Sequence, residues 1–447
     1  MNLDAFEHYP VPRAVASFAI PSVLTSLVTV FYNMADTFFV GQTGDPNQVA
    51  AVSLATPVFL LLLACGNIFG IGGGSCLSRA LGEGKYEKVK KISSFCFFSC
   101  IAVGLLMMIL FFSAMPVILQ IAGSSANTES FAREYLSCCA YGAVFVVVSV
   151  AFGNLVRAEG AAKISMCGMM LGTVVNIVLD PIMILWMGMG VKGAAWATVI
   201  GNISSTIFYL GYIIFSRKTF LSFNPKYFSL KEGIPFGVLV IGIPAFLNNL
   251  LMSTSNILTN NFLVKYGDVA VAGMGVAMKA NMLVVFLQLG IAMGIQPLIG
   301  YCYGAKNHSR LKSVMKFSMI CSVIIGSTLT VIYLIFSKNI VGIFIQNEDV
   351  IVFGEKMLRA LMLSSSLIGI MFVFTFSFQA MGKAISSLVL SVSRQGLIFF
   401  PVLVLSNLFF GLNGIIFAQP IADLGCLLTA LIMFVHLSHQ WKKEKIG

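Results

Sequence analysis

Three carboxyl side chains lie deep inside long apolar segments of this 447-residue chain, namely Asp36, Asp180 and Asp423. The other acidic residues lie in loops or at the ends of apolar runs. An ionisable group inside a bilayer is costly, so such a residue marks a functional site by default. Carboxylates in that position can bind Na⁺ through oxygen ligands, or they can exchange protons.

Polar side chains accompany two of these acids at helical spacing: Asn176 one turn before Asp180, and Tyr32 and Asn33 on the face of Asp36. At about 1.5 Å of rise per residue, the two acids and Thr198 lie at one level, near the outer ends of their helices. We therefore expect an ion-coupling site that holds Na⁺ or H⁺ and comprises Asp36, Asn176, Asp180 and Thr198, joined by Tyr32. The alternative is a hydrogen-bond network between helices with no role in transport.

The third acid has basic neighbours instead. Lys279 and Arg394 lie at a depth similar to that of Asp423, in the same half of the chain. An acid between two cations is most simply a buried charge network, so we expect these three residues to stabilise the fold. Direct contact with a substrate is the alternative.

The segments that position these residues are membrane helices. Apolar residues make up 58% of the chain and charged residues 10%, against about 25% charged in a soluble domain. A large soluble enzyme is thereby excluded. Runs long enough to span a bilayer, about 20 residues each, predict an all-α integral membrane protein with twelve transmembrane helices, at 14–40, 48–76, 92–113, 135–153, 164–187, 193–215, 236–264, 270–301, 314–336, 357–379, 385–405 and 412–437.

The basic residues orient these helices. Of the 28 Lys and Arg residues, 20 lie in the termini and the loops on the same side, and 6 lie in the opposite loops. Positive charge marks cytoplasmic loops, so we expect a multi-pass protein of the inner (plasma) membrane with both termini cytoplasmic. The same flanking residues account for the net charge of +11, and no nucleic-acid partner is expected.

The two halves of the chain resemble each other. Residues 19–45 align with 242–268, which places Pro21 on Pro244. The pattern predicts two lobes of six helices in a parallel repeat, an architecture in which transporters alternate access by rocking one lobe on the other. The expected bounds are 1–215 for the N-lobe, 216–233 for a cytoplasmic linker and 234–447 for the C-lobe.

The sequence offers little for enzymatic chemistry. It contains no G-x-x-x-x-G-K-[ST] loop for ATP, and its four histidines lie in loops or at membrane edges. The ten cysteines lack the spacing of a zinc or disulfide framework. We expect no enzyme activity, no cofactor and no metal centre beyond a possible Na⁺.

At these residues the sequence resembles the MATE (multidrug and toxic compound extrusion) family of the MOP flippase superfamily. The resemblance covers essentially the whole chain, and its most specific parts are Pro21, Tyr32 to Asp36 followed by FFVGQ, Asn176 to Pro181, the loops with Gly82 and Gly304, and 157–160. It implies an N-lobe cation or proton site at Asp36, Asn176, Asp180 and Thr198. It further implies a polar network at Asn154 and a bend of the first helix at Pro21.

The C-lobe departs from acid-bearing members of this family. The seventh helix offers a polar face of Asn249, Asn256 and Thr259, and Thr259 takes the repeat position of Asp36. The tenth helix has no acid. A C-lobe sodium site is therefore not expected, and coupling should rest on the N-lobe.

The resemblance implies an antiporter that exports amphipathic, often cationic, drugs or toxins in exchange for H⁺ or Na⁺. We expect a monomer whose partners are small-molecule substrates and membrane lipid. A flippase of lipid-linked oligosaccharides from the same superfamily is the first alternative, and Lys279 and Arg394 are the residues that favour it. An integral membrane enzyme and a passive channel are the others.

Overall fold

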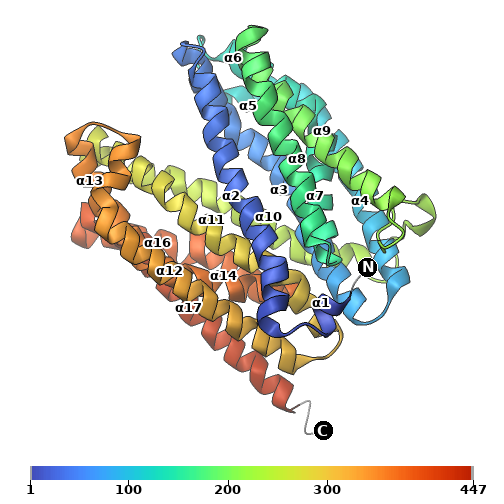
Figure 1. The fold of residues 1–447 in the computed structure, drawn as a ribbon. Coiled ribbons are helices and arrows are strands. Elements are labelled where there is room, and N and C mark those ends of the chain that lie inside the picture. Colours follow the sequence, from blue (N-terminus) through green and yellow to red (C-terminus); the bar gives the residue numbers. More distant parts are fainter. Residues whose placement is uncertain (1–2, 444–447) are drawn as a thin grey trace. The chain divides into compact units, whose positions relative to one another are not determined.

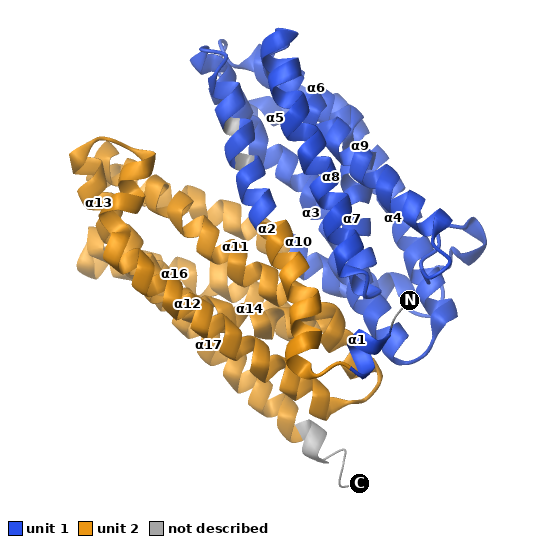
Figure 2. Cartoon of the chain, in the orientation of Figure 1, with its two compact units in different colours: residues 1–8, 27–246 blue, residues 9–26, 247–447 orange. Residues whose placement is uncertain are grey.

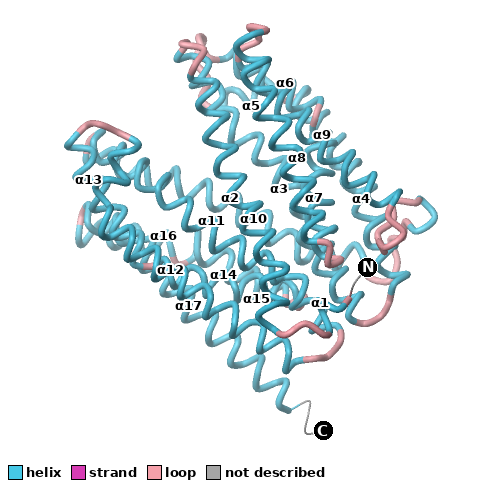
Figure 3. Tube along the Cα trace, viewed as in Figure 1, coloured by secondary structure: helices cyan, strands magenta, loops and turns pink. Residues whose placement is uncertain are grey.

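The computed structural model describes residues 3–443, without the side chains of residues 33, 37 and 440–443. Within this range the chain is helical, with short connecting loops and no strand (Figure 3). Ten helices are long and apolar enough to cross a membrane, and two bent helix pairs raise the number of candidate spans to twelve. The prediction of a twelve-helix, all-α membrane protein is therefore confirmed.

The chain forms two compact units, residues 1–8 with 27–246 and residues 9–26 with 247–447 (Figure 2). Two helices, α2 (Val11–Gly41) and α10 (Ile234–Leu263), have residues in both units. The units therefore differ from the expected lobes. Unit 1 includes the first part of α10, which was expected in the C-lobe, and unit 2 includes the first part of α2, which was expected in the N-lobe.

Unit 1 contains the first half of the repeat. Besides its part of α2 and the opening of α10, its elements are α1 (Asp4–Glu7), α3 (Pro46–Gly82), α4 (Tyr86–Ser113), α5 (Met115–Ile121), α6 (Glu129–Tyr141), α7 (Ala143–Ala158), α8 (Ala162–Asp180), η1 (Pro181–Trp186), α9 (Val191–Phe215) and η2 (Pro225–Tyr227). Inside the unit, α3 packs on α7 and α4, and α8 packs on α9 (Figure 1).

Unit 2 contains the second half. Besides its parts of α2 and α10, its elements are η3 (Val264–Tyr266), α11 (Asp268–Gly304), α12 (His308–Phe344), α13 (Glu348–Leu363), α14 (Ser365–Ala380), α15 (Ala384–Val392), η4 (Ser393–Leu397), α16 (Phe399–Phe410) and α17 (Leu412–Lys443). Here α11 is central and packs on α12, α13 and α14.

The irregular segments of the helices occur at equivalent positions in the two halves of the chain. The fourth span is bent by 58° where α6 meets α7, and the tenth is bent by 47° where α13 meets α14. The fifth and eleventh spans each contain a π-helical segment, η1 and η4. Asp180 directly precedes η1, and Arg394 lies inside η4. π-helical segments often occur at functional sites. The positions of η1 and η4 therefore support Asp180 and Arg394 as candidate functional residues.

Glycines allow the shared helices to pack closely within their units. In unit 1, a Cβ on Gly72 of α3 would lie 2.1 Å from the carbonyl oxygen of Val238 of α10. In unit 2, a Cβ on Gly294 of α11 would lie 2.6 Å from the Cα of Ala19 of α2. Small residues at such crossings bring helix backbones into contact in membranes, and any larger side chain would separate them.

The segment expected as a linker, 216–233, belongs to unit 1 and is packed against it. Its backbone at Ser222 exchanges hydrogen bonds with Ser93 Oγ, at 2.9 and 3.0 Å, and Ser94 Oγ donates to the carbonyl of Asn224 at 2.9 Å. Lys91 forms an ion pair with Glu232. This segment is therefore a fixed part of the unit rather than a free tether.

We predict that Gly72→Ala lowers the thermal unfolding midpoint of the purified protein, because the added methyl group has no room against Val238. Overpacking of this kind costs about 1–3 kcal/mol. Gly275→Ala on α11 is the matched control, since nothing lies within 4 Å of a Cβ at that position. Equal midpoints for the two variants would contradict the close crossing of α3 and α10.

Candidate functional site

The predicted ion-coupling residues meet inside unit 1. Tyr32 and Asp36 lie one turn apart on α2, Asn176 and Asp180 lie one turn apart at the end of α8, and Thr198 lies on α9. Two glycines bring α8 and α9 together beside them: a Cβ on Gly172 would lie 2.6 Å from the carbonyl oxygen of Gly201.

Thr198 is the common partner in this cluster. Its hydroxyl lies 3.3 Å from the Tyr32 hydroxyl, and Asn176 Nδ2 donates to it at 3.3 Å. The same Asn176 amide group lies 3.5 Å from Asp180 Oδ1. Asn176, Asp180 and Thr198 are buried, with at most 3% of their surface exposed. The structure therefore joins α2, α8 and α9 through side chains that the sequence had grouped by depth alone.

Three oxygens of this cluster lack a hydrogen-bond donor among the described residues. They are Asp36 Oδ1, Asn176 Oδ1 and Asp180 Oδ2, and all three are buried. The two carboxylates are also close enough for their charges to interact. Buried polar atoms are almost always paired, so this arrangement favours a cation or protons as the partner of these oxygens. Carboxylate and amide oxygens are ligands of a hard cation such as Na⁺. Among the described residues, no group of three or more His, Cys, Asp or Glu residues is arranged to hold a metal ion, and this cluster contains only two acids.

Asn154 is not brought to this cluster. Its amide donates to the carbonyl of Val150 at 2.9 Å and to Asn67 Oδ1 at 3.4 Å, and its Oδ1 accepts a hydrogen bond from Arg157. It belongs to a separate polar group on α3 and α7. The side chain of Asn33 lies outside the described residues.

The helix that carries Asp36 also carries Pro21, but the two lie in different units. Proline has no N–H group and interrupts the hydrogen bonding of the preceding turn. Nearby, Thr25 Oγ1 donates to the carbonyl of Pro21 at 2.8 Å. α10 also contains a proline, Pro244, which lies three residues before Leu247, where α10 passes from unit 1 into unit 2.

In unit 2 the predicted charge network is partly present. Arg394 Nε donates to Asp423 Oδ1 at 2.9 Å, and Gln419 Nε2 donates to the same oxygen at 3.0 Å. The ring of Phe372 lies 5.1 Å from the guanidinium carbon. The Asp423 side chain is fully buried and that of Arg394 is 12% exposed. This pair is a buried ion pair that links η4 to α17.

Lys279 is not a member of this network, which corrects the prediction. Its side chain is exposed on α11, and no ion pair involves it among the described residues. Depth along a helix was a poor guide here, because it does not specify the face on which a side chain lies.

The polar face expected on the seventh helix is only partly accessible. Thr259 is 9% exposed, and its hydroxyl donates to the carbonyl of Ser255, one turn earlier, at 2.8 Å. Ser255 in turn donates to the carbonyl of Gln395 at 2.6 Å. Asn249 and Asn256 are half-buried. Thr259 thus has an internal partner, unlike Asp36 at the equivalent position of the repeat.

Glu159 is a buried acid whose environment the sequence did not reveal. It follows the last residue of α7 and is fully buried beneath the segment 216–233. Thr219 Oγ1 lies 2.9 and 3.0 Å from its two carboxylate oxygens, and the Phe220 N–H donates to it at 3.2 Å. Burial raises the pKa of Glu159 to about 7, against the opposing effect of these hydrogen bonds.

Taken together, these features define a polytopic membrane protein with an internal repeat and a buried polar site, and comparison with known proteins identifies its family. A protein-family model described as MatE matches residues 21–182 and 244–424, one stretch in each half. The chain is 33% identical over 432 residues to "Multidrug export protein MepA" of Staphylococcus aureus, covering 97% of this chain and 95% of that protein. It therefore belongs to the MATE family, as the resemblance implied.

Solved structures agree on the fold. A structure described as "Outward-facing conformation of a multidrug resistance MATE family transporter of the MOP superfamily" has a TM-score of 0.92 at 24% identity, covering 100% of this chain and 99% of that one. Another, from Pyrococcus furiosus, is described as "Reverse polarity of binding pocket suggests different function of a MOP superfamily transporter"; it has a TM-score of 0.91 at 24% identity, covering 99% and 98%. Membership of the MATE family and the similarity to multidrug export proteins make the chain a transporter, and the alternative of a membrane enzyme is excluded.

We predict that Asp423→Asn lowers the thermal unfolding midpoint and the expression level, because it leaves Arg394 without its buried counter-charge. Breaking one partner of a buried ion pair costs about 3–5 kcal/mol. Asp423→Asn combined with Arg394→Met should recover part of the loss, whereas Lys279→Met should leave the midpoint unchanged. Recovery by Lys279→Met instead of Arg394→Met would show that Lys279 is the partner of Asp423.

Proposed function

We propose that this protein is a secondary-active efflux antiporter that exports amphipathic, mainly cationic, compounds in exchange for H⁺ or Na⁺. Its relatives named multidrug export proteins support the efflux of drugs. The observation that carries the ion coupling is the set of three buried oxygens at Asp36, Asn176 and Asp180 that lack a donor.

The coupling follows from the electrostatics of this site. Without a bound cation, two nearby carboxylates repel each other in a medium of low dielectric constant, where charge interactions are strong. A proton or Na⁺ removes this repulsion and gives the unpaired oxygens a partner. Tyr32, on the same helix as Asp36, contacts Thr198, so binding would draw α2 towards α8 and α9 within unit 1.

The helices shared by the units offer a route from this site to a change of access. α2 and α10 run through both units, and each has a proline shortly before the change, Pro21 and Pro244. We propose that these prolines are hinges, because a helix bends most easily where its hydrogen bonding is interrupted. Binding of H⁺ or Na⁺ at Asp36 would then alter the bend of α2, and the two units would rock about the shared helices.

The setting of the transporter is also a proposal. The excess of Lys and Arg on the side of both termini supports cytoplasmic termini, and export from the cell supports a place in the plasma membrane. We propose that the protein works as a monomer, because both halves of the repeat lie in one chain.

A second candidate function rests on Lys279. An exposed lysine within the span of α11, with no ion pair among the described residues, favours a water-filled cavity that admits negatively charged groups. Such a residue would suit an exporter of anionic compounds or a flippase of lipid-linked oligosaccharides. The Pyrococcus furiosus structure of the same fold, described by the "reverse polarity" of its binding pocket, supports keeping this candidate.

We predict that Asp36→Asn and Asp180→Asn each abolish ethidium efflux from energised cells while protein level and thermal midpoint stay near those of the wild type. Asn keeps the shape of the side chain but can neither take up a proton nor supply a full charge. Asp45→Asn is the control, because Asp45 caps α3 through Asn47 N and Asn caps a helix equally well. Efflux at the wild-type rate by Asp36→Asn or Asp180→Asn would refute the assignment of the site.

The substrate class is tested by Lys279→Met in an efflux panel of cationic and anionic dyes. If the main substrates are cations, this variant should export them at least as well as the wild type, because it removes a repelling charge. A wild-type protein that exports anionic dyes, together with a stable Lys279→Met variant that has lost this activity, would favour the anion exporter or flippase.

A further inference from the structure

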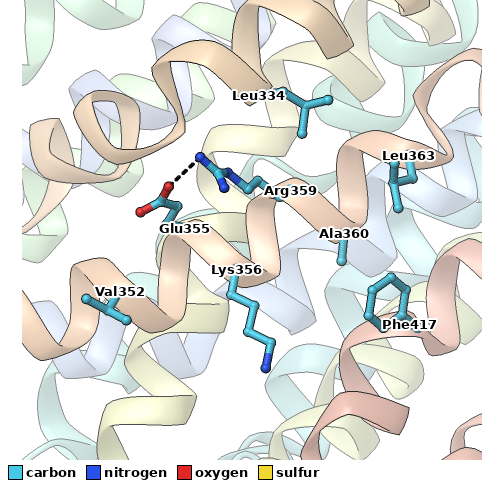
Figure 4. A pocket seen from close by; sticks show the side chains of 8 residues that line it. All are labelled: Leu334, Val352, Glu355, Lys356, Arg359, Ala360, Leu363 and Phe417. Carbon is cyan, nitrogen blue, oxygen red and sulfur yellow. Dashed lines mark ion pairs between the residues drawn. The ribbon is translucent and has the colours of Figure 1, made fainter.

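A shallow groove crosses the exposed face of α13 in unit 2. Its volume is about 400 Å³, within the range of small-molecule sites, and Figure 4 shows the side chains that line it. α13 provides the floor, with Leu334 of α12 on one side and Phe417 of α17 on the other. The groove thus lies over three helices of the same unit.

One end of the groove is apolar, and the other carries Lys356, Arg359 and the acid Glu355, with Val352 beside them. Along α13, Lys356 and Arg359 are followed within one turn by Ala360 and Leu363. Figure 4 shows Lys356 and Arg359 leaving the helix on opposite flanks. A basic region that passes directly into an apolar one fits a ligand with an anionic head and an aliphatic tail.

The two cations differ in how much of their charge is already neutralised. Arg359 forms an ion pair of 2.7 Å with Glu355, and its Nε donates to Ser337 Oγ at 2.9 Å. Lys356 is exposed and has no hydrogen-bond or ion-pair partner among the described residues. Its ammonium group is therefore available to an external anion, whereas Arg359 leaves the opposite flank of α13 and is already paired.

The positive charge here is unusual for this side of the protein. Only six of the 28 Lys and Arg residues lie on the side opposite the termini, and three of them belong to two consecutive helices: Lys338 near the end of α12, and Lys356 and Arg359 in the second half of α13. The loop count predicts few basic residues on this side, so the presence of two of them, Lys356 and Arg359, at one groove calls for a local explanation.

The depth of these residues suits a membrane interface. At about 1.5 Å per residue, Lys356 lies about 12 Å from the start of α13, and Lys338 about 9 Å from the end of α12. α12 has 37 residues with a kink at Phe336, which is more than the roughly 20 residues that a span needs, and Lys338 lies beyond this kink. The cations therefore lie near the headgroup level and the apolar end of the groove lies below it.

The surroundings of the groove are those of a lipid-facing surface. Val331 and Ile335 on α12 are 56% and 67% exposed, and Ile421 and Leu424 on α17 are 46% and 47% exposed. These residues extend the apolar walls formed by Leu334 and Phe417. A ligand in the groove would thus be continuous with the acyl chains of the bilayer.

We propose that this groove is a binding site for an anionic phospholipid. Lys356 contacts the phosphate, and the acyl chains lie along Leu363 and Phe417. The site is separate from the ion-coupling residues of unit 1, so the proposal holds whatever cation drives transport.

The test measures lipid binding directly. Native mass spectrometry of the purified protein, titrated with phosphatidylglycerol or phosphatidylcholine, gives the affinity for each lipid. The wild type should bind phosphatidylglycerol more tightly, and Lys356→Gln should weaken that binding about fivefold, the effect of one basic residue near a membrane surface. Because Lys356 is exposed and unpaired, its replacement should not affect folding, which a thermal unfolding curve verifies.

Lys192→Gln is the matched control, since Lys192 is an exposed lysine of the same side of the protein that lies in unit 1. It should leave the affinity for phosphatidylglycerol unchanged. Equal losses in Lys192→Gln and Lys356→Gln, or no loss in either, would overturn the proposal. Glycerol 3-phosphate has the same anionic group without acyl chains, and if it competed fully with phosphatidylglycerol, the groove would be a site for soluble phosphate rather than lipid.

Discussion

The free-energy cost of an unpaired charge or polar atom inside a bilayer governs this structure. The two units compensate for this cost in different ways. Unit 2 neutralises its buried acid internally, because Arg394 and Gln419 both donate to Asp423 Oδ1, although Asp423 Oδ2 has no donor among the described residues. Unit 1 leaves oxygens of Asp36, Asn176 and Asp180 without donors, and no ion pair among the described residues involves Asp36 or Asp180. On physical grounds, an acid with a buried counter-charge has little need of a cation, whereas two acids without one favour binding a cation.

The backbone is adapted to the same constraint. A straight α-helix satisfies its own hydrogen bonds, so irregular backbone in a membrane helix needs compensation from its neighbours. The irregular segments η1 and η4 lie beside the buried charges, and both units contain one. Prolines interrupt α2 and α10, the helices that belong to both units. Some of the features that disturb regular helices therefore lie where ion binding and movement are proposed, and others, at Pro57, Pro297 and Pro420, lie in α3, α11 and α17.

Much of this arrangement could be predicted from the sequence, because hydropathy alone specifies where a helix enters and leaves a membrane. Depth also brought Asp36, Asp180 and Thr198 to one level, and Tyr32, one turn from Asp36, and Asn176, one turn from Asp180, both contact Thr198. Depth does not specify the rotation of a helix, however, so Lys279 was wrongly assigned to the network of Asp423. The burial of Glu159 depends on a segment 60 residues further along the chain, and no local pattern reveals such a long-range contact.

The most direct test of the account is ethidium transport in liposomes that contain only the purified protein, with one ion gradient imposed at a time. The account predicts that a gradient of protons or of sodium drives ethidium against its concentration, and that an ionophore for that ion stops the movement. If ethidium moves uphill under neither gradient, or at the same rate with and without them, then the acids of unit 1 do not couple a cation to export.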